Sequence, residues 1–381
     1  MATELLSYFN ARQSELLAGA RALVEQESPT LDARANTALT RELKPRFEAL
    51  GAATQIYQTE RGAHLVARAA FGHSANSRPV MLLGHVDTVW PCGTLARRPF
   101  RVENGRAYGP GIFDMKSGLA VMLAALEAIH ELGLEPQHQL KILLSCDEES
   151  GSSTSRDLIE AEAAECAAVF VLEPSLPGGG VKTERKGIAN YEVIVHGVSA
   201  HAGLDPEKGV SATTELAHQL LALNQLNDLT RGISVNVGVM RGGTFSNVIA
   251  AEARAEVEVR FRTMAQGEEV SRRIESLKPV LEGARLEVRG GLNRPPLERT
   301  SAVMALFAHA RSIGAELGFE LGEGESGGAS DGNFTAALGI PTLDGLGVEG
   351  DGAHAEHEHI LVADLPRRAA LITALLTREL Q

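Results

Sequence analysis

The hydrophobic residues of this chain follow two patterns, one before residue 182 and one after it. Before it, apolar runs occupy residues 64–70, 79–85, 139–147 and 167–174, and segments of helical periodicity precede and separate them. Near-continuous apolar runs are typical of strands buried on both faces, and the intervening segments predict helices that cover those faces. The pattern therefore predicts an α/β unit with a mixed, mostly parallel sheet covered by helices.

After residue 182, apolar residues alternate with polar ones, which is typical of strands with one face in water. Strand-like and helix-like segments then follow in the order β-α-β-β-α-β, the order of a ferredoxin-like unit. Glycine-rich segments flank this stretch and are suited to act as hinges. We therefore expect residues 183–291 to form an inserted α+β domain, with residues 1–182 and 292–381 forming the main domain on either side of it.

The composition excludes several classes of function. The chain has 36 Lys and Arg against 49 Asp and Glu, a net charge of −13, without a basic block, so neither nucleic acid nor a membrane surface is an expected partner. No apolar run approaches the ~20 residues that span a bilayer. The N-terminal segment lacks the regions of a signal peptide, which makes the cytoplasm the expected location. The three cysteines have no CxxC spacing and predict neither disulfides nor a thiolate metal site.

Polar residues that are costly to bury stand at the ends of the predicted strands. His85 and Asp87 close one strand, Glu148 and Glu149 follow a second, and Glu173 follows a third. The crevice beyond the carboxyl ends of strands is where α/β proteins usually build their chemistry. We therefore expect these side chains to meet at one edge of the sheet.

Two further residues extend this set. Asp114 lies in the glycine-rich loop "GPGIFDMKSG", and His354 lies in "GAHAEHEHI". Each candidate alone has an ordinary structural explanation. Together, two imidazoles and three carboxylates fit two divalent ions that share Asp114 and leave room for a bridging water, the open arrangement of a catalytic site. The mixed nitrogen and oxygen donors suit Zn²⁺, with Co²⁺ or Mn²⁺ as alternatives.

A series of segments resembles one enzyme family along nearly the whole chain. The segments are "GHVDTVWPCGTLARRPF", "GRAYGPGIFDMKSGLAVML", "CDEESGS", "VLEPS", "RKGIANYEVIVHGVSAHAG", "GGTFSNVIA", "GGASDGNF" and "GAHAEHEHI". The family is the di-zinc aminoacylase/carboxypeptidase family, which includes glutamate carboxypeptidases, acetylornithine deacetylases and succinyl-diaminopimelate desuccinylases. The second half of the first segment and the core of the second are most similar to the bacterial glutamate carboxypeptidases.

The resemblance implies two sets of metal ligands. His85 and Glu173 would bind one ion, Glu149 and His354 would bind the other, and Asp114 would bridge them, with a cis peptide bond after it. The last ligand of the family stands in an H-x-x-x-E pattern, which His354 and Glu358 match. His357 and His359 are the competing candidates for this ligand.

The resemblance also implies the remaining roles. Glu148 would be the general base, Asp87 would fix the His85 ring, and His201 would stabilise the oxyanion from a lid that acts on the partner subunit in dimeric members. Asn247 and Arg260 would bind the carboxylate of the substrate, and Ser330 would belong to the loop that holds the substrate. A homodimer formed through the inserted domain is therefore expected.

These expectations describe a metal-dependent amidohydrolase that acts through a metal-bridging water. It would remove a C-terminal amino acid, best represented by glutamate, from an N-acyl amino acid or a short peptide. The alternative is an N-acyl-amino-acid deacylase of the acetylornithine deacetylase kind, with the same chemistry and a different acyl pocket. A binding protein without activity on the same scaffold is the remote alternative, because the ligands and Glu148 are all present.

Overall fold

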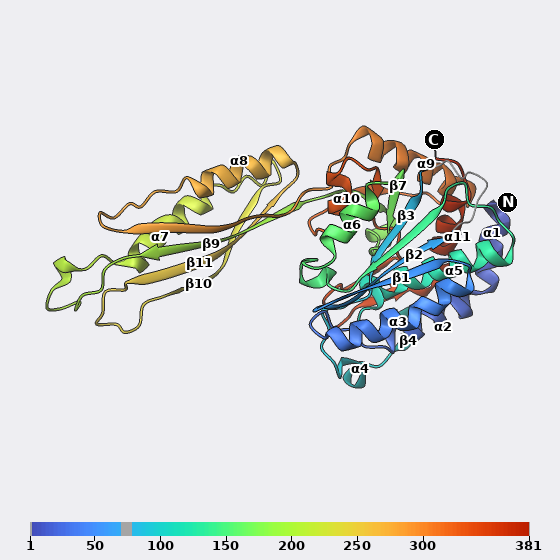
Figure 1. Ribbon diagram of the computed structural model, residues 1–381, viewed down its shortest axis with the longest axis horizontal. Coiled ribbons are helices and arrows are strands. Elements are labelled where there is room, and N and C mark those ends of the chain that lie inside the picture. The colour runs from blue at the N-terminus through green and yellow to red at the C-terminus, as the bar shows by residue number, and fades with distance from the viewer. Residues whose placement is uncertain (1, 70–77, 381) are drawn as a thin grey trace. The chain divides into compact units, whose positions relative to one another are not determined.

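The computed structural model describes residues 2–69 and 78–380, which form two units (Figure 1). The larger unit comprises Met1–Glu184, Arg299–Ser326 and Ser330–Gln381, and the smaller unit comprises Arg185–Glu298 with Gly327–Ala329. We describe each unit by itself.

The smaller unit extends further along the chain than the expected insertion of residues 183–291. Arg185 and Leu297 exchange two backbone hydrogen bonds of 3.0 Å, and Glu298 accepts a hydrogen bond of 2.9 Å from the backbone of Met264. These contacts keep the chain in the smaller unit as far as Glu298. The structure thus places the end of the smaller unit at Glu298, beyond the expected end at residue 291.

A six-stranded sheet forms the centre of the larger unit. Its order is β1 (Ala53–Thr59), β2 (Gly62–Ala69), β6 (Leu140–Ser145), β3 (Val80–His85), β7 (Ala168–Val171) and β14 (Thr342–Leu343). Strands β6, β3, β7 and β14 are parallel to one another, whereas β2 is antiparallel to both of its neighbours. The expected mixed, mostly parallel sheet is confirmed.

Successive residues of the central strands pack into two different cores. Val80 and Leu82 of β3 join one cluster of buried side chains, and Met81 and Leu83 join another. A strand with both faces buried has no place for polar residues, which explains its continuous apolar run.

Helices cover both faces of this sheet. The first cluster includes side chains of α1 (Ala2–Ala11), α2 (Gln13–Val24), α3 (Ala33–Ala49), α5 (Ser117–Glu131), α9 (Ser301–Glu316) and α11 (Leu365–Leu376). The second cluster includes side chains of α6 (Arg156–Ala163) and α10 (Gly332–Ala337). The short helix α4 (Thr94–Arg97) follows the segment that contains His85 and Asp87.

Short strands bring the C-terminal loop beside the glycine-rich loop. The order is β15 (Gly350–Asp351), β16 (His359–Leu361), β5 (Arg106–Tyr108) and β4 (Arg101–Glu103), and all neighbours are antiparallel. The loop between β15 and β16 contains His354, and the segment after β5 contains Asp114. A further pair consists of β8 (Val181–Arg185) and β13 (Glu323–Ser326).

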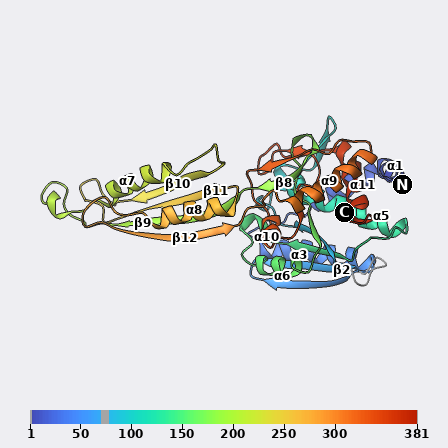
Figure 2. The same cartoon turned by 90° about the horizontal axis from the view of Figure 1, so that it is seen from above.

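The smaller unit is a four-stranded antiparallel sheet with two helices on one face (Figures 1 and 2). Its spatial order is β10 (Ser234–Gly242), β11 (Glu252–Phe261), β9 (Gly187–His196) and β12 (Arg285–Arg294). Helices α7 (Ala212–Asn224) and α8 (Met264–Glu275) pack on it. The chain order and the pairing are those of a ferredoxin-like unit.

Alternation along β11 explains why one face of this sheet is open. Val257, Val259 and Phe261 are buried against the helices, while Glu256 and Glu258 between them point to the other side. None of the helices in the described residues is long and apolar enough to cross a membrane.

Candidate metal centre

The parallel strands deliver most of the candidate residues to one edge of the larger sheet. His85 is the last residue of β3, Glu148 and Glu149 follow β6, and Glu173 follows β7. Parallel neighbours end on the same side, so these side chains gather there. His85 and Glu173 are buried, with 2% and 6% of their surface exposed.

Asp114 lies between the two imidazoles. Its Oδ1 is 3.3 Å from His85 Nε2, and its Oδ2 is 3.4 Å from His354 Nε2. His85 Nε2 is also 3.4 Å from Glu173 Oε1, and His354 Nε2 is 3.0 Å from Glu149 Oε2. The structure therefore divides the five candidate ligands into two sets joined by one carboxylate.

Glu148 lies beside the first of these sets. Ligand atoms of His85, Glu148 and Glu173 lie within 4.8 Å of one another, as do those of His85, Asp114 and Glu149. Such spacing allows one ion to touch several of these atoms.

Asp87 connects the strand of His85 to the two glutamates. Its carboxylate accepts the backbone N–H groups of Glu148 (3.3 Å) and Glu149 (3.1 Å). His85 Nδ1 is 2.9 Å from the main-chain oxygen of Asp87 and 3.4 Å from its Oδ1. The ring therefore donates from Nδ1, which leaves Nε2 facing the other carboxylates.

The carboxylates change the protonation of both imidazoles. Burial alone would lower the pKa of His85, but Asp114, Asp87 and Glu173 raise it well above its ordinary value. Hydrogen bonds to Asp114 and Glu149 raise the pKa of His354 to about 10. Raised pKa values favour the protonated, positively charged form of both rings, which pairs with the surrounding carboxylates when no metal is bound.

The pKa values of the two inner carboxyls move in opposite directions. Burial raises the pKa of Glu149 to about 7, against the effect of its hydrogen bond with His354. Burial would also raise the pKa of Asp114, but the hydrogen bonds of His354 and His85 hold it far below its usual range.

The cluster fits divalent ions by its donor set and by an unsatisfied atom. Glu149 Oε1 is buried and has no hydrogen-bond partner among the described residues. An unpaired carboxylate oxygen in a dry site is costly unless a cation compensates it. The nitrogen and oxygen donors are those of a Zn²⁺ site and would also accept Co²⁺ or Mn²⁺.

The C-terminal loop directs His354, and not its neighbours, to this cluster. His354 has a left-handed backbone with φ of 61°, and half of its side chain is exposed. His357 is exposed, and its nearest carboxylate is Asp351 at 3.8 Å. The ring of His359 packs on Tyr108, with ring centres 5.2 Å apart.

The glycine-rich loop has two features that bear on Asp114. The peptide bond between Asp114 and Met115 is cis, as the family resemblance implies. The carboxylate of Glu358 accepts hydrogen bonds from this loop, although the sequence pattern assigned no role to Glu358. Its only signal was its spacing of four residues from His354.

In the smaller unit, the loop of His201 lies against the segment of Asn247. His201 Nδ1 accepts the backbone N–H groups of Gly203 and Leu204, both at 3.1 Å. A neutral ring held this way carries its proton on Nε2 and can donate from that atom. The backbone oxygen of Asn247 accepts the N–H of Ala202 at 3.0 Å.

The other two candidate substrate ligands already have partners. The guanidinium of Arg260 donates to Glu258 Oε1 (2.8 Å) and to the main-chain oxygen of Gly327 (3.2 Å). Ser330 is fully buried in the larger unit, and its hydroxyl donates to Asp344 (2.6 Å). A contact of either residue with substrate stays a prediction.

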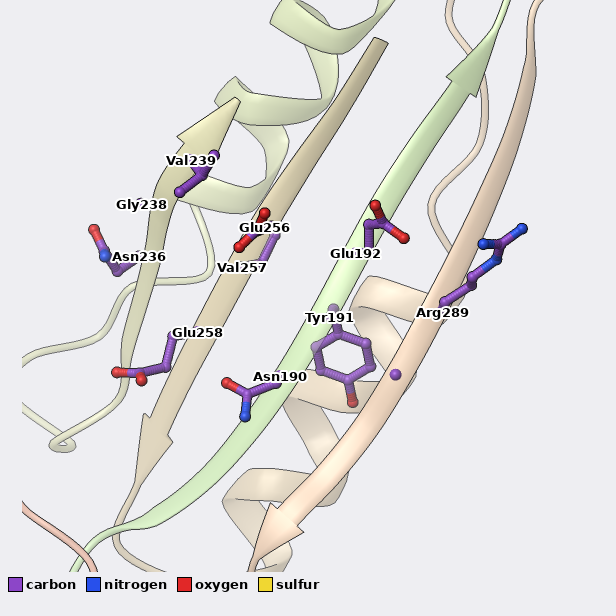
Figure 3. Close-up of a pocket in the computed structure, with 11 residues that line it drawn as sticks. Asn190, Tyr191, Glu192, Asn236, Gly238, Val239, Glu256, Val257, Glu258 and Arg289 are labelled. Atoms are coloured by element: carbon purple, nitrogen blue, oxygen red, sulfur yellow. The ribbon is translucent and has the colours of Figure 1, made fainter. Parts of the chain in front are cut away.

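A hollow of about 620 Å³ lies over the open face of the smaller sheet (Figure 3). Glu192, Glu256 and Glu258 line it together with Arg289, and none of the candidate site residues does. The hollow is an open sheet surface, lined by charged and apolar residues together. The candidate metal ligands lie outside this hollow, at the strand ends of the larger unit.

Comparisons with known proteins identify the family of the chain. Residues 81–378 match the model of peptidase family M20/M25/M40. Carboxypeptidase G2 of Pseudomonas sp. (strain RS-16) is 33% identical over 305 residues, covering 78% of this chain and 73% of that protein. Succinyl-diaminopimelate desuccinylase of Verminephrobacter eiseniae is 28% identical over 322 residues, covering 79% of each.

A solved structure shows the same fold. The aminopeptidase PepT of Bacillus cereus superposes with a TM-score of 0.78 at 24% identity, covering 96% of this chain and 98% of the other. The resemblance inferred from the sequence motifs is thereby confirmed. The chain belongs to peptidase family M20/M25/M40, a family of metal-dependent peptidases and amidohydrolases.

Proposed function

We propose that this protein uses two divalent metal ions, Zn²⁺ in the first place, to hydrolyse an amide bond and release a C-terminal amino acid, in particular glutamate. The substrate would be an N-acyl amino acid or a short peptide. The observation that carries this proposal is the position of Asp114, with one oxygen toward His85 and the other toward His354. The similarity to carboxypeptidase G2 supports the choice of substrate.

The ligands would act in two sets. His85 and Glu173 would hold one ion, Glu149 and His354 the other, and Asp114 both. Bound ions would supply electrophilic polarisation of the amide carbonyl and would lower the pKa of a water molecule between them. Asp87 would hold the segment of Glu149 in place for this role, because its carboxylate accepts the backbone N–H groups of Glu148 and Glu149.

Glu148 would move the proton. Its carboxylate lies near His85 and Glu173, where it can take a proton from the attacking water. It would then pass this proton to the nitrogen of the leaving amine. Because Asp87 accepts its backbone N–H, Glu148 would keep this position through both steps.

His201 would stabilise the oxyanion of the tetrahedral state. The backbone N–H groups of Gly203 and Leu204 use Nδ1 as an acceptor, so Nε2–H is free to donate. Hydrogen-bond donors that meet the charge as it develops lower the barrier most. Asn247 and Arg260 of the same unit would bind the carboxylate of the substrate.

A homodimer through the smaller unit is part of this proposal. Strand β10 is an edge strand, and the side chains of Met240, Phe245 and Leu221 near it are exposed by 67%, 75% and 66%. Exposed apolar side chains beside an unpaired strand edge suit contact with a second copy of the chain. In such a dimer His201 would serve the site of the partner.

The alternative is an N-acyl-amino-acid deacylase, and the desuccinylase among the relatives favours it. The two functions are separated by a substrate panel on protein reconstituted with Zn²⁺ or Co²⁺. The panel contains N-acyl and dipeptide substrates that end in glutamate, and the same acyl groups on ornithine, diaminopimelate and neutral amino acids. Highest kcat/KM on the C-terminal glutamate series supports the proposal, while a preference set by the acyl group supports the alternative. A Glu148→Gln protein is the control for contaminating hydrolase.

A further inference from the structure

One buried carboxylate outside the proposed ligand set contacts the segments that carry the ligands. The side chain of Glu358 is fully buried. Its Oε1 accepts the backbone N–H groups of Phe113 (2.9 Å) and Asp114 (3.2 Å). Its Oε2 accepts the backbone N–H of Gly111 (2.8 Å) and the indole N–H of Trp90 (2.7 Å). Each oxygen is therefore a double acceptor.

These hydrogen bonds join three segments that are far apart in the sequence. Trp90 lies in the segment after Asp87, Asp114 belongs to the glycine-rich loop, and Glu358 stands four residues after His354. Strand pairing supports the same arrangement, because β16 begins immediately after Glu358 and lies antiparallel to β5. Glu358 thus fixes the loop of Asp114 against the loop of His354.

The chemistry of this contact favours glutamate over similar side chains. Four N–H groups converge on two oxygens, and an ionised carboxylate is a pure acceptor. Glutamine has the same shape, but its NH₂ group would face two N–H donors whichever way the amide is turned. Aspartate is one methylene shorter and would leave one pair of donors unsatisfied, which is costly in a buried position.

We infer that Glu358 is a positioning residue for the metal pair, holding Asp114 at the separation from His354 that lets one carboxylate serve two ions. The inference rests on the proposed function, because it takes Asp114 and His354 as metal ligands. Glu358 touches neither ion nor substrate in this account and acts only through the backbone of the Asp114 loop. Hydrogen-bond partners of this kind govern metal affinity as well as activity.

The test compares two buried carboxylates in the full-length protein. Glu358→Gln changes the proposed positioning residue, and Glu215→Gln is the matched control. Glu215 is also fully buried and accepts the backbone N–H groups of Val280 (3.0 Å) and Leu281 (2.7 Å), but it lies in the smaller unit. The readouts are Co²⁺ dissociation constants from competition with a chelator, the visible spectrum of the Co²⁺-loaded protein, and thermal unfolding without metal.

Glu358→Gln should weaken Co²⁺ binding by about 10- to 100-fold and change the visible spectrum. Glu215→Gln should lower the melting temperature while leaving Co²⁺ affinity and spectrum as in the wild type. The inference is overturned if Glu358→Gln binds Co²⁺ like the wild type, or if Glu215→Gln weakens binding as much.

If Glu358→Gln does not fold, Trp90→Phe provides a second test of the inference. It removes one N–H donor to Glu358 and retains the aromatic ring under Arg98, whose guanidinium lies 4.3 Å from the ring centre. It should weaken Co²⁺ binding about 2- to 10-fold, and an unchanged affinity counts against the inference. A wild type that binds Co²⁺ but hydrolyses no member of the panel would refute the substrate proposal and leave this comparison valid, whereas a wild type that binds no Co²⁺ would overturn both.

Discussion

Asp114 directs its Oδ2 atom to His354 Nε2, 3.4 Å away, while its other oxygen faces a second imidazole. If this carboxylate serves both ions, substitution of Asp114 should affect metal content more than substitution of His354. The wild type should bind about two divalent ions and lose its activity to a chelator. Asp114→Ala should lose both ions, whereas His354→Ala should lose mainly one, as measured by elemental analysis after dialysis.

His357→Ala is the matched control for His354→Ala. It lies three residues further along the same loop and does not face the cluster. It should keep the full metal content. Full amidase activity in a wild type without bound metal would contradict the mechanism altogether.

The metal-free protein should become less stable as the pH rises from about 6.5 to 10. Hydrogen bonds to Asp114 and Glu149 raise the pKa of His354 to about 10. An imidazole with a higher pKa in the folded chain than its unfolded value of ~6.5 stabilises the fold fully below that value. This stabilisation is lost as the pH rises through the folded pKa. Burial raises the pKa of Glu149 to about 7. The stability that protonated Glu149 contributes is therefore also lost as the pH rises, but at lower pH than that of His354.

Thermal unfolding in the presence of a chelator at several pH values measures this effect. The decline should be reduced in His354→Ala and retained in His357→Ala. Saturation with Zn²⁺ should reverse the trend, because metal binding requires the neutral imidazole. A flat profile for the chelated wild type would mean that His354 does not pair with the carboxylates in solution.

Neighbouring glutamates should show different defects. Glu148→Gln should keep both ions and lower kcat by about 10²-fold or more, the usual effect of losing a general base. Glu149→Gln should instead lose one ion, because its carboxylate faces His354 at 3.0 Å. The comparison requires metal analysis and kcat on the same preparations. Near-normal kcat in Glu148→Gln would show that the base has been assigned to the wrong residue.

Much of the larger unit follows directly from its sequence. The apolar run that ends at His85 predicts a strand buried on both faces, and Val80 to Leu83 alternate between two cores. The polar residues at the strand ends likewise predict one edge of the sheet as the site. These features were visible because burial on two faces and the ends of parallel strands leave local signals in the sequence.

Other features have no such local signal. Strand β1, with the sequence "ATQIYQT", is half-exposed and carries too few apolar residues to stand out. The N-terminal segment has helical periodicity, but the structure divides it at Arg12 into α1 and α2. Three of the four hydrogen bonds to Glu358 come from backbone N–H groups, which every residue except proline has, so the identity of these partner residues does not reveal them.

The last prediction concerns His201 and the subunit on which it acts. If its Nε2–H donates to the oxyanion, it contributes mainly in the transition state. His201→Ala should then lower kcat by about 10²- to 10³-fold without changing the metal content. His218→Ala is the matched control, since it alters an exposed histidine on α7 of the same unit and should leave kcat unchanged.

Mixing two inactive proteins decides whether His201 acts on its own chain or on its partner. In a heterodimer of Glu148→Gln and His201→Ala subunits, action across the dimer gives one site with both defects and one site with neither. Activity should then rise to as much as half of the wild-type value per heterodimer. Action within the chain leaves one defect in every site, so mixing restores nothing. Absence of recovery after verified subunit exchange would exclude action across the dimer, and a monomer in sedimentation experiments would exclude it without any mixing.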